Sequence, residues 1–264
     1  MPELPEVETV VRSIASLVGR RIVSAEFRGL RVLRGGNPER LAAALAGRRV
    51  ASIQRYGKFI VISLGRGGYL VIHLGMTGRL LLGGEVGKHT HGIFTLDRGV
   101  LLYDDIRQFG SIEWSGEFPA RVARLGPEPL ETSFDDFTRS LKRRKTRIKA
   151  LLLDQSFLRG IGNIYADEAL FRAGIHPLAS ASRLGGARPR RLFDAIRAVL
   201  TEAIAAGGSS ISDYVDAGGR RGFFQLRHRV YQRAGEPCLE CGSRIRRVLV
   251  AQRSSHFCPR CQRR

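Results

Sequence analysis

The sequence predicts an α+β protein of several domains: an antiparallel β-sandwich with flanking helices, a helical domain, and a C-terminal zinc-ribbon hairpin. Three patterns predict this fold: short apolar runs between glycine turns over residues 21–114, helical periodicity on both sides of them, and two Cys-x2-Cys pairs near the end. With 264 residues and 43% hydrophobic content, the chain can build more than one core. We expect domains at 1–118, 119–222 and 223–264.

The first six residues combine a helix start with reactive groups. Apolar residues at helical spacing predict an amphipathic helix: Leu4, Val7, Val11, Ile14 and Val18. Removal of Met1 would expose the secondary amine of Pro2 beside the carboxylates of Glu3 and Glu6. A terminal amine, with an ordinary pKa near ~8, keeps a neutral fraction that can attack an aldehyde-like carbon. Taken alone, however, prolines and glutamates suit the start of any helix, and that plainer interpretation is favoured at this point.

The region from Arg21 to Trp114 has the pattern of short strands. The predicted strands are Ile22–Phe27, Val50–Gln54, Phe59–Leu64, Tyr69–Leu74, Arg79–Leu82, Ile93–Leu96, Val100–Tyr103 and Ser111–Trp114. The glycine-containing segments 65–68 and 97–99 are predicted hairpin turns. Eight short strands indicate an antiparallel sandwich. The helix before them is expected to end near Gly19.

Helical periodicity returns after the proline-containing segment 126–129. Ser133 is a predicted helix cap, and the further predicted helices are Thr146–Leu153, Asn163–Arg172 and Pro189–Ala205. Six of the eight residues from Lys142 to Lys149 are basic. That run is either a solvated helix face or a phosphate-binding surface, and its own sequence favours neither.

The net charge indicates a polyanionic partner. Lys and Arg number 44 against 24 Asp and Glu, which gives a formal charge of +20. Because Lys and Arg gain affinity by releasing counterions from phosphates, nucleic acid is the leading candidate, with ribosomal or chromatin-like packing as the alternative. The sequence has no secretory signal, no apolar run of membrane-spanning length and no lipidation motif, so we expect a cytoplasmic protein that does not bind membranes.

The four cysteines are Cys238, Cys241, Cys258 and Cys261, with sixteen residues between the two pairs. This spacing fits a zinc ribbon in which four thiolates hold one Zn²⁺. Four protein ligands leave no open position, so the expected ion is structural; disulfides or free thiols are the less favoured alternatives. Residues 220–264 contain twelve arginines and two glutamates, which predicts contact with phosphates.

A glycine-rich turn, Gly160-Ile161-Gly162-Asn163-Ile164-Tyr165-Ala166, is similar to the turn of helix-two-turn-helix DNA binders. Its glycines allow the amide groups of the next helix to approach a phosphate, although a packing turn is the commoner interpretation of such a segment in isolation. Four motifs occur in order along the chain: the Pro-Glu-Leu-Pro-Glu start, Gly57-Lys58-Phe59, this turn and the four-cysteine ribbon. Together they closely resemble the bacterial formamidopyrimidine-DNA glycosylase family.

The resemblance implies a DNA glycosylase with AP lyase activity that acts in base excision repair. Such an enzyme excises oxidised purines, namely 8-oxoguanine and formamidopyrimidines, from duplex DNA and cleaves the strand by β,δ-elimination. The implied architecture is a β-sandwich, a helix-two-turn-helix domain and a zinc finger. The implied partner is double-stranded DNA with oxidised bases or abasic sites, bound by a monomer in the bacterial cytoplasm and nucleoid. Neither a metal nor an organic cofactor is implied in the chemistry.

The resemblance also implies roles for individual residues. Pro2 is the nucleophile at the sugar C1′ and Glu3 is the general acid/base. Glu6 supports them as a second carboxylate or only complements the helix dipole. Lys58 matches a strand lysine that reaches the phosphate or base of the lesion, with an exposed strand lysine as the plain alternative. Arg253, in the zinc hairpin, completes the catalytic set by gripping a phosphate beside the flipped nucleotide.

Further residues match DNA contacts of the family. A flipped nucleotide leaves a vacancy in the duplex, and Met76, Arg107 and Phe109 match the residues that fill it. Glycines flank the segments that carry Met76 and Phe109, which favours exposure, although buried core is the usual place for such side chains. His91 and Asn163 match two more DNA contacts.

The chain departs from the family pattern at Gln108, where a second basic residue is frequent. The segment Ala217–Phe224 corresponds to a flexible lesion-sensing loop and is hard to interpret, so lesion preference stays open. One alternative is the endonuclease VIII branch, which favours oxidised pyrimidines and generally lacks this Met, Arg and Phe combination. The other is a noncatalytic DNA-binding module, which would need neither Pro2, Glu3 nor Lys58.

Overall fold

The computed structural model describes residues 1–211 and 214–264. By their contacts, the residues form two compact units: Met1–Arg124 with Ala206–Gln225, and Leu125–Ala205 with Leu226–Arg264. The predicted domains 1–118, 119–222 and 223–264 stay a prediction, but Ala206–Gln225 packs with the N-terminal unit rather than with the helices before it. Within the described part of the chain, no helix is long and apolar enough to cross a membrane.

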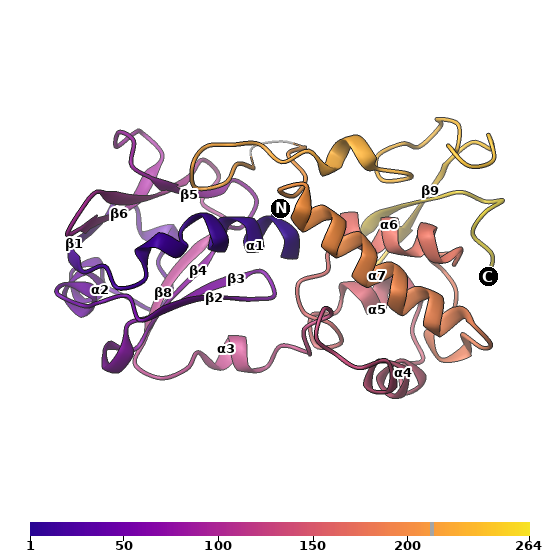
Figure 1. Cartoon of the computed structure of the whole chain (residues 1–264), viewed down its shortest axis with the longest axis horizontal. Helices are drawn as coiled ribbons and strands as arrows, with labels where there is room; N and C mark the ends of the chain where they lie inside the picture. Colours follow the sequence, from indigo (N-terminus) through magenta and orange to yellow (C-terminus); the bar gives the residue numbers. More distant parts are fainter. Residues whose placement is uncertain (212–213) are drawn as a thin grey trace. The chain divides into compact units, whose positions relative to one another are not determined.

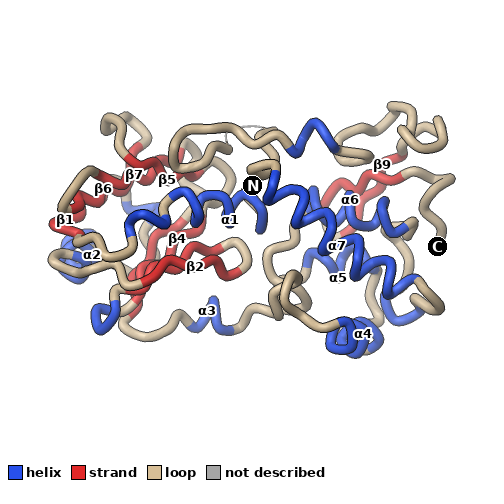
Figure 2. Tube along the Cα trace, viewed as in Figure 1, coloured by secondary structure: helices blue, strands red, loops and turns tan. Residues whose placement is uncertain are grey.

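Two antiparallel four-stranded sheets form the N-terminal unit, which confirms the predicted fold class (Figures 1 and 2). One sheet has the order β1-β6-β7-β5 and contains Ile22–Phe27, Thr90–Leu96, Val100–Asp105 and Gly78–Leu82. The other has the order β2-β3-β4-β8 and contains Ser52–Tyr56, Phe59–Ser63, Tyr69–His73 and Ser111–Ser115. All eight predicted strands are present, with some ends shifted.

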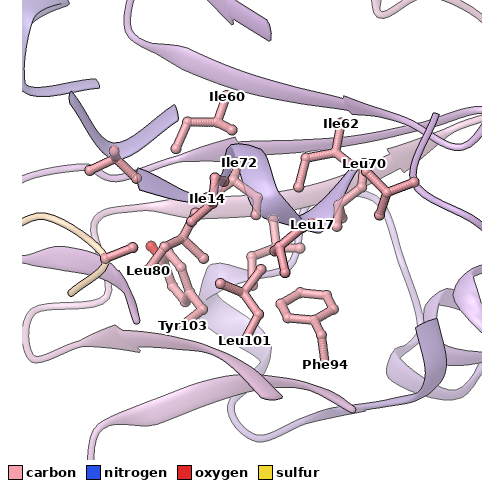
Figure 3. Close-up of a cluster of buried hydrophobic side chains, with 14 of the residues drawn as sticks. Ile14, Leu17, Ile60, Ile62, Leu70, Ile72, Leu80, Phe94, Leu101 and Tyr103 are labelled. Atoms are coloured by element: carbon pink, nitrogen blue, oxygen red, sulfur yellow. The ribbon is translucent and has the colours of Figure 1, made fainter. Parts of the chain in front are cut away.

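The core of this unit draws apolar side chains from both sheets and from the N-terminal helix (Figure 3). Ile60 and Ile72 come from one sheet, Phe94 and Tyr103 from the other, and Ile14 from the end of the helix. All five are at most 1% exposed. Burying a side chain of this kind stabilises the fold by about 1.5–3 kcal/mol. The sandwich therefore gives the first helix a firm support.

The N-terminal helix is shorter than predicted. Helix α1 covers Leu4–Ser13, and the chain continues as a 3-10 turn at Ala15–Leu17 before the left-handed Gly19. Helix α2, Pro38–Leu45, was not predicted from the sequence, although the Asn37 side chain caps it by accepting the Arg40 N–H at 3.1 Å. Figure 1 shows α1 beside β2 and β3, which it contacts.

Helices and one β-hairpin form the second unit. The helices are α4 (Phe134–Lys142), α5 (Ile148–Leu153), α6 (Asn163–Ala173) and α7 (Arg188–Ala205), and the hairpin pairs β9 (Arg246–Val250) with β10 (Arg253–Phe257). A short helix, α3 (Ala120–Ala123), lies at the end of Met1–Arg124, the first stretch of the N-terminal unit. The Ser133 hydroxyl caps α4 as predicted, accepting the Asp136 N–H at 3.1 Å.

Candidate active site

The reactive end of the chain lies at the start of α1. Met1 is half exposed, whereas Pro2, Glu3 and Glu6 are buried. One oxygen of the Glu6 carboxylate accepts the Glu3 N–H at 2.8 Å, and the other accepts the Ser209 N–H at 2.7 Å. Glu6 therefore does more than complement the helix dipole: it joins the residue beside Pro2 to the segment that begins at Ala206.

Gly208, Ser209 and Tyr214 of this segment all approach Glu6. Gly208 has a φ of +82°, and a Cβ there would meet the Glu6 Oε1 at 2.8 Å, so glycine allows the close approach. Tyr214 donates its hydroxyl to the Glu6 carbonyl at 3.1 Å. Ser209 was not predicted as a site residue, although the Gly207-Gly208 pair before it was a signal of close backbone approach.

The predicted lesion-sensing loop, Ala217–Phe224, begins in the core of the N-terminal unit and ends at a buried residue. Ala217 is 1% exposed; its N–H bonds the Ser13 hydroxyl at 3.1 Å, and its carbonyl accepts the Leu82 N–H at 2.9 Å. Phe224 is buried, whereas Phe223 is 63% exposed. The role of this loop in lesion recognition stays a prediction.

Lys58 does not lie in a strand, because Gly57 and Lys58 form the turn between β2 and β3. It is also 9% exposed, so the alternative of an exposed strand lysine is wrong. Lys58 is one of three cations, with Arg121 and Arg34, that together with burial lower the pKa of His73 to about 4; burial is the largest cause. The His73 Nδ1 accepts the Gly75 N–H at 3.1 Å. His73 is therefore neutral at physiological pH and adds no positive charge near Lys58.

Two loops carry the residues predicted to fill the duplex, which we call the wedge residues: Met76, Arg107 and Phe109. Met76 follows β4, while Arg107 and Phe109 follow β7. Met76 is 41% and Phe109 59% exposed, so their predicted exposure is confirmed. The Arg107 guanidinium lies 4.6 Å from the centre of the Phe109 ring. Their role as void fillers stays a prediction.

His91 lies in β6 and is 8% exposed. Its Nδ1 is 2.8 Å from the Arg28 carbonyl oxygen, and its Nε2 is 3.0 Å from that of Asp105. The ring thus ties the end of β7 to the residues after β1. Its predicted DNA contact is not tested by these bonds.

In the second unit, Asn163 and Arg253 come from neighbouring elements. Asn163 is the first residue of α6, and its Nδ2 donates to the Ser254 carbonyl at 2.9 Å. Among the described residues, its Oδ1 has no hydrogen-bond partner. Arg253 is exposed and follows a two-residue turn in which Ala251 and Gln252 both have positive φ, as the tight turn of a hairpin requires. Ser254 therefore links the two predicted phosphate contacts.

An ion-paired network lies beneath these two residues. Lys149 is fully buried and donates to the Asp167 carboxylate at 2.5 Å and to the Asn163 carbonyl at 3.1 Å. The second Asp167 oxygen accepts the His256 N–H at 2.9 Å. For Lys149, both interpretations of the basic run were therefore wrong, because it is neither solvated nor on the surface; residues 142–147 are exposed.

The four cysteines of the hairpin form a compact cluster. Their sulfur atoms all lie within 4.8 Å of one another, with 4.0 Å between Cys238 and Cys261 and 3.4 Å between Cys241 and Cys258. A tetrahedral ion with metal–sulfur bonds of about 2.3 Å needs sulfurs about 3.8 Å apart. The cysteines are not bonded as disulfides. The donor set therefore fits a structural metal ion, as predicted.

Comparisons with known proteins agree with these motifs. Three family models match the chain: the Formamidopyrimidine-DNA glycosylase N-terminal domain at residues 1–112, the Formamidopyrimidine-DNA glycosylase H2TH domain at 125–215, and the zinc finger found in FPG and IleRS at 235–264. A Solibacter usitatus protein named formamidopyrimidine-DNA glycosylase is 72% identical, with 100% of both chains covered. This chain belongs to the formamidopyrimidine-DNA glycosylase family. The enzyme class of that family, DNA glycosylase with AP lyase activity, is therefore the class of this chain.

Solved structures of the formamidopyrimidine-DNA glycosylase family share the fold. The MutM (FPG) protein of Thermus thermophilus matches with a TM-score of 0.89 and 43% identity, over 99% of this chain and 98% of that one. The Lactococcus lactis Fpg in complex with abasic-site DNA matches with a TM-score of 0.89 and 36% identity, over 99% and 100%. Both likenesses extend over the sandwich, the helix-two-turn-helix region and the zinc finger, which confirms the predicted architecture.

Proposed function

We propose that this enzyme excises oxidised purines, 8-oxoguanine and formamidopyrimidines, from duplex DNA and then cleaves the strand. The observation that carries the proposal is the arrangement at the start of α1, where Pro2 is buried and the adjacent Glu3 N–H bonds the buried carboxylate of Glu6. A Lactococcus lactis FPG mutant with a TM-score of 0.90 and 36% identity, which covers both chains fully, was solved with Fapy-dG containing DNA. That relative supports a formamidopyrimidine as one substrate.

The proposed chemistry starts once Met1 has been removed. The neutral amine of Pro2 attacks C1′ as the bond from C1′ to the base breaks. The base leaves with that electron pair and takes up a proton, while the Pro2 nitrogen releases its own. Glu3 protonates the ring oxygen as the sugar opens, which leaves an iminium between Pro2 and C1′. The cation acidifies the C2′ hydrogen, so loss of that proton expels the 3′ phosphate. A second elimination expels the 5′ phosphate.

In the proposed binding mode, residues other than Pro2 and Glu3 hold the DNA. A flipped nucleotide costs a few kcal/mol of stacking, and the wedge residues fill the space that it leaves. Lys58 reaches the phosphate or base of the lesion, Asn163 and Arg253 contact phosphates around the flipped nucleotide, and His91 makes a further DNA contact. These roles are in keeping with the net charge of +20. We also propose that the enzyme binds double-stranded DNA as a monomer.

The metal of the cysteine cluster is proposed to be a single Zn²⁺. Four thiolates at tetrahedral spacing suit this ion, and a reducing cytoplasm keeps them available. When bound, it would hold the β9–β10 hairpin that carries Arg253 and would take no part in bond breaking. The proposed location is accordingly the bacterial cytoplasm and its nucleoid.

Borohydride trapping tests the proposal. The reagent reduces an iminium, so the protein becomes covalently bound to a duplex with 8-oxoguanine opposite cytosine. Pro2→Gly should abolish both trapping and base excision while leaving nonspecific DNA affinity intact, whereas Pro5→Gly, which removes the proline inside α1, should still trap. Trapping only on an oxidised-pyrimidine duplex would favour the endonuclease VIII alternative. A protein that traps on neither lesion nor on abasic DNA would refute the proposal.

A further inference from the structure

Asp105, a buried residue without an assigned role, connects the two loops that carry the wedge residues. It is 0% exposed. One carboxylate oxygen accepts the Thr77 hydroxyl at 2.5 Å, and the other accepts the Gly110 N–H at 2.8 Å. Thr77 follows Met76 directly, and Gly110 follows Phe109 directly. The Asp105 side chain thus fixes the residue that follows Met76 in one loop and the residue that follows Phe109 in the other.

Thr77 closes the connection from the other side. Its hydroxyl oxygen also accepts the Arg107 N–H at 3.1 Å. Thr77 therefore bonds the backbone of one wedge residue, Arg107, and is the chain neighbour of another, Met76. Thr77 is 6% exposed. Without this hydroxyl, the Arg107 N–H and an Asp105 oxygen would each lose a partner. The loss costs most at Asp105, which is fully buried.

The backbones of the two loops are also in contact. A Cβ on Gly75 would lie 2.4 Å from the Gly110 nitrogen, so glycine is needed for them to pass this closely. Directly beyond the loops, Gly78 of β5 pairs with Asp105 of β7. The Tyr103 hydroxyl lies 3.3 Å from the Asp105 carboxylate and donates to it. Both loops are therefore anchored at the same place in the sheet, where β5 and β7 are hydrogen-bonded to each other.

We infer that Thr77 and Asp105 form a clamp that holds Met76 at a fixed spacing from Arg107 and Phe109, so that the wedge enters the duplex as one preorganised body. The inference rests on the proposed function, in which these residues fill the space left by the flipped nucleotide. A clamped wedge has already lost the freedom that two independent loops would lose on binding DNA. Thr77 and Asp105 are positioning residues, since they act through the wedge and not on the substrate.

The test compares a substrate that needs the wedge with one that does not. Single-turnover base excision from an 8-oxoguanine–cytosine duplex requires insertion, whereas cleavage of a single-stranded abasic oligonucleotide requires only the Pro2 chemistry. Thr77→Val keeps the shape and removes the hydroxyl; it should slow duplex excision roughly tenfold and leave single-strand cleavage unchanged. Thr77→Ser, which keeps the hydroxyl, should restore duplex excision. Met76→Ala, which removes a wedge side chain directly, is the reference: it should slow duplex excision and leave single-strand cleavage unchanged.

Two measurements separate the clamp from general stability. In a Pro2→Gly background, 2-aminopurine beside the lesion should brighten less on binding when Thr77→Val is added, because fewer bases are unstacked. In the wild-type protein, the Arg107 and Gly110 amides should exchange hydrogen as slowly as the neighbouring strand amides, which tests the clamp without any variant.

The outcomes are distinguishable from failure of the proposed function. A wild-type protein that cleaves abasic DNA but excises no oxidised purine would refute the proposed substrate. A wild-type protein that excises 8-oxoguanine, together with a Thr77→Val protein that slows both substrates equally, would overturn the clamp. Fast exchange at Arg107 and Gly110 would overturn it as well.

Discussion

The two units bury carboxylates in different ways. At the start of α1, Glu6 accepts hydrogen bonds from the Glu3 and Ser209 backbone amides, and these donors fix geometry without adding positive charge. In the second unit, Asp167 pairs with the buried ammonium of Lys149 and so joins α5, α6 and β10. Amide donors suit a site where an amine must be held for chemistry, whereas an ion pair suits a frame that holds two phosphate contacts. Damage to the first should lower activity, and damage to the second should lower stability and DNA affinity.

Metal removal should produce the largest effect, confined to the second unit. A structural zinc site contributes on the order of 10 kcal/mol to folding, so chelation should unfold the β9–β10 hairpin and displace Arg253. We expect DNA affinity, measured by fluorescence anisotropy, to fall more than about tenfold and to return when zinc is added back, since lost arginine–phosphate contacts are the cause. The sandwich should keep its unfolding transition. Unchanged affinity in the apo protein would show that the hairpin does not bind DNA.

Loss of one partner in the buried ion pair should rank second. Lys149→Met leaves the Asp167 charge in the interior, at a cost of about 3–5 kcal/mol in the free energy of unfolding of the second unit. Denaturant titration measures this cost. Lys142→Met is the matched control, because that lysine is exposed in the same basic run and its loss should leave stability nearly unchanged. Equal effects of the two variants would contradict the assigned role of the pair.

The strand pattern made the sandwich predictable because alternating apolar residues and glycine turns are local signals. All eight strands and the Ser133 cap were found in this way. The early end of α1 was not predictable, since Ile14 keeps the helical spacing but leaves the helical backbone, with ψ at 7°. Helix α2 was missed because its three consecutive alanines carry little periodicity.

Site residues with a sequence motif could be named, but their partners could not. The opening motif and the cysteine spacing pointed to Pro2, Glu3 and the metal ligands. Ser209 and Asp105 have no such motif: each takes its place through a contact with a residue distant in sequence, Glu6 in one case and Thr77 in the other. Lys149 was misjudged for the same reason, because its partner Asp167 comes from a different helix.

Glu6→Gln should have a smaller effect, of the opposite kind to that of Lys149→Met. A glutamine has a single acceptor oxygen, so its amide group must face the N–H of either Glu3 or Ser209, at a cost of about 1–3 kcal/mol. We expect the rate of base excision to fall while the Kd for DNA stays nearly constant, because phosphate contacts are untouched. Single-turnover kinetics and anisotropy measure the two quantities. Glu26→Gln, which affects an exposed pair with Arg28, is the control. A change in Kd alone would sink this assignment.

Histidine titration gives the smallest and most finely resolved test of the comparison. Burial lowers the pKa of His73 to about 4, with Lys58, Arg121 and Arg34 as further causes, and burial alone lowers that of His228 to about 4. Between pH 6.5 and 4 the unfolded chain takes up a proton that the folded chain refuses, so stability falls as the pH falls through that window. Between pH 7 and pH 5.5, each histidine should lower the free energy of unfolding by about 1 kcal/mol. Denaturant titrations at the two pH values should show that His73→Gln removes its contribution from the sandwich and that His228→Gln removes its contribution from the second unit. If either variant altered the pH dependence of the opposite unit, the two units would be coupled in unfolding and the separation of roles between them would fail.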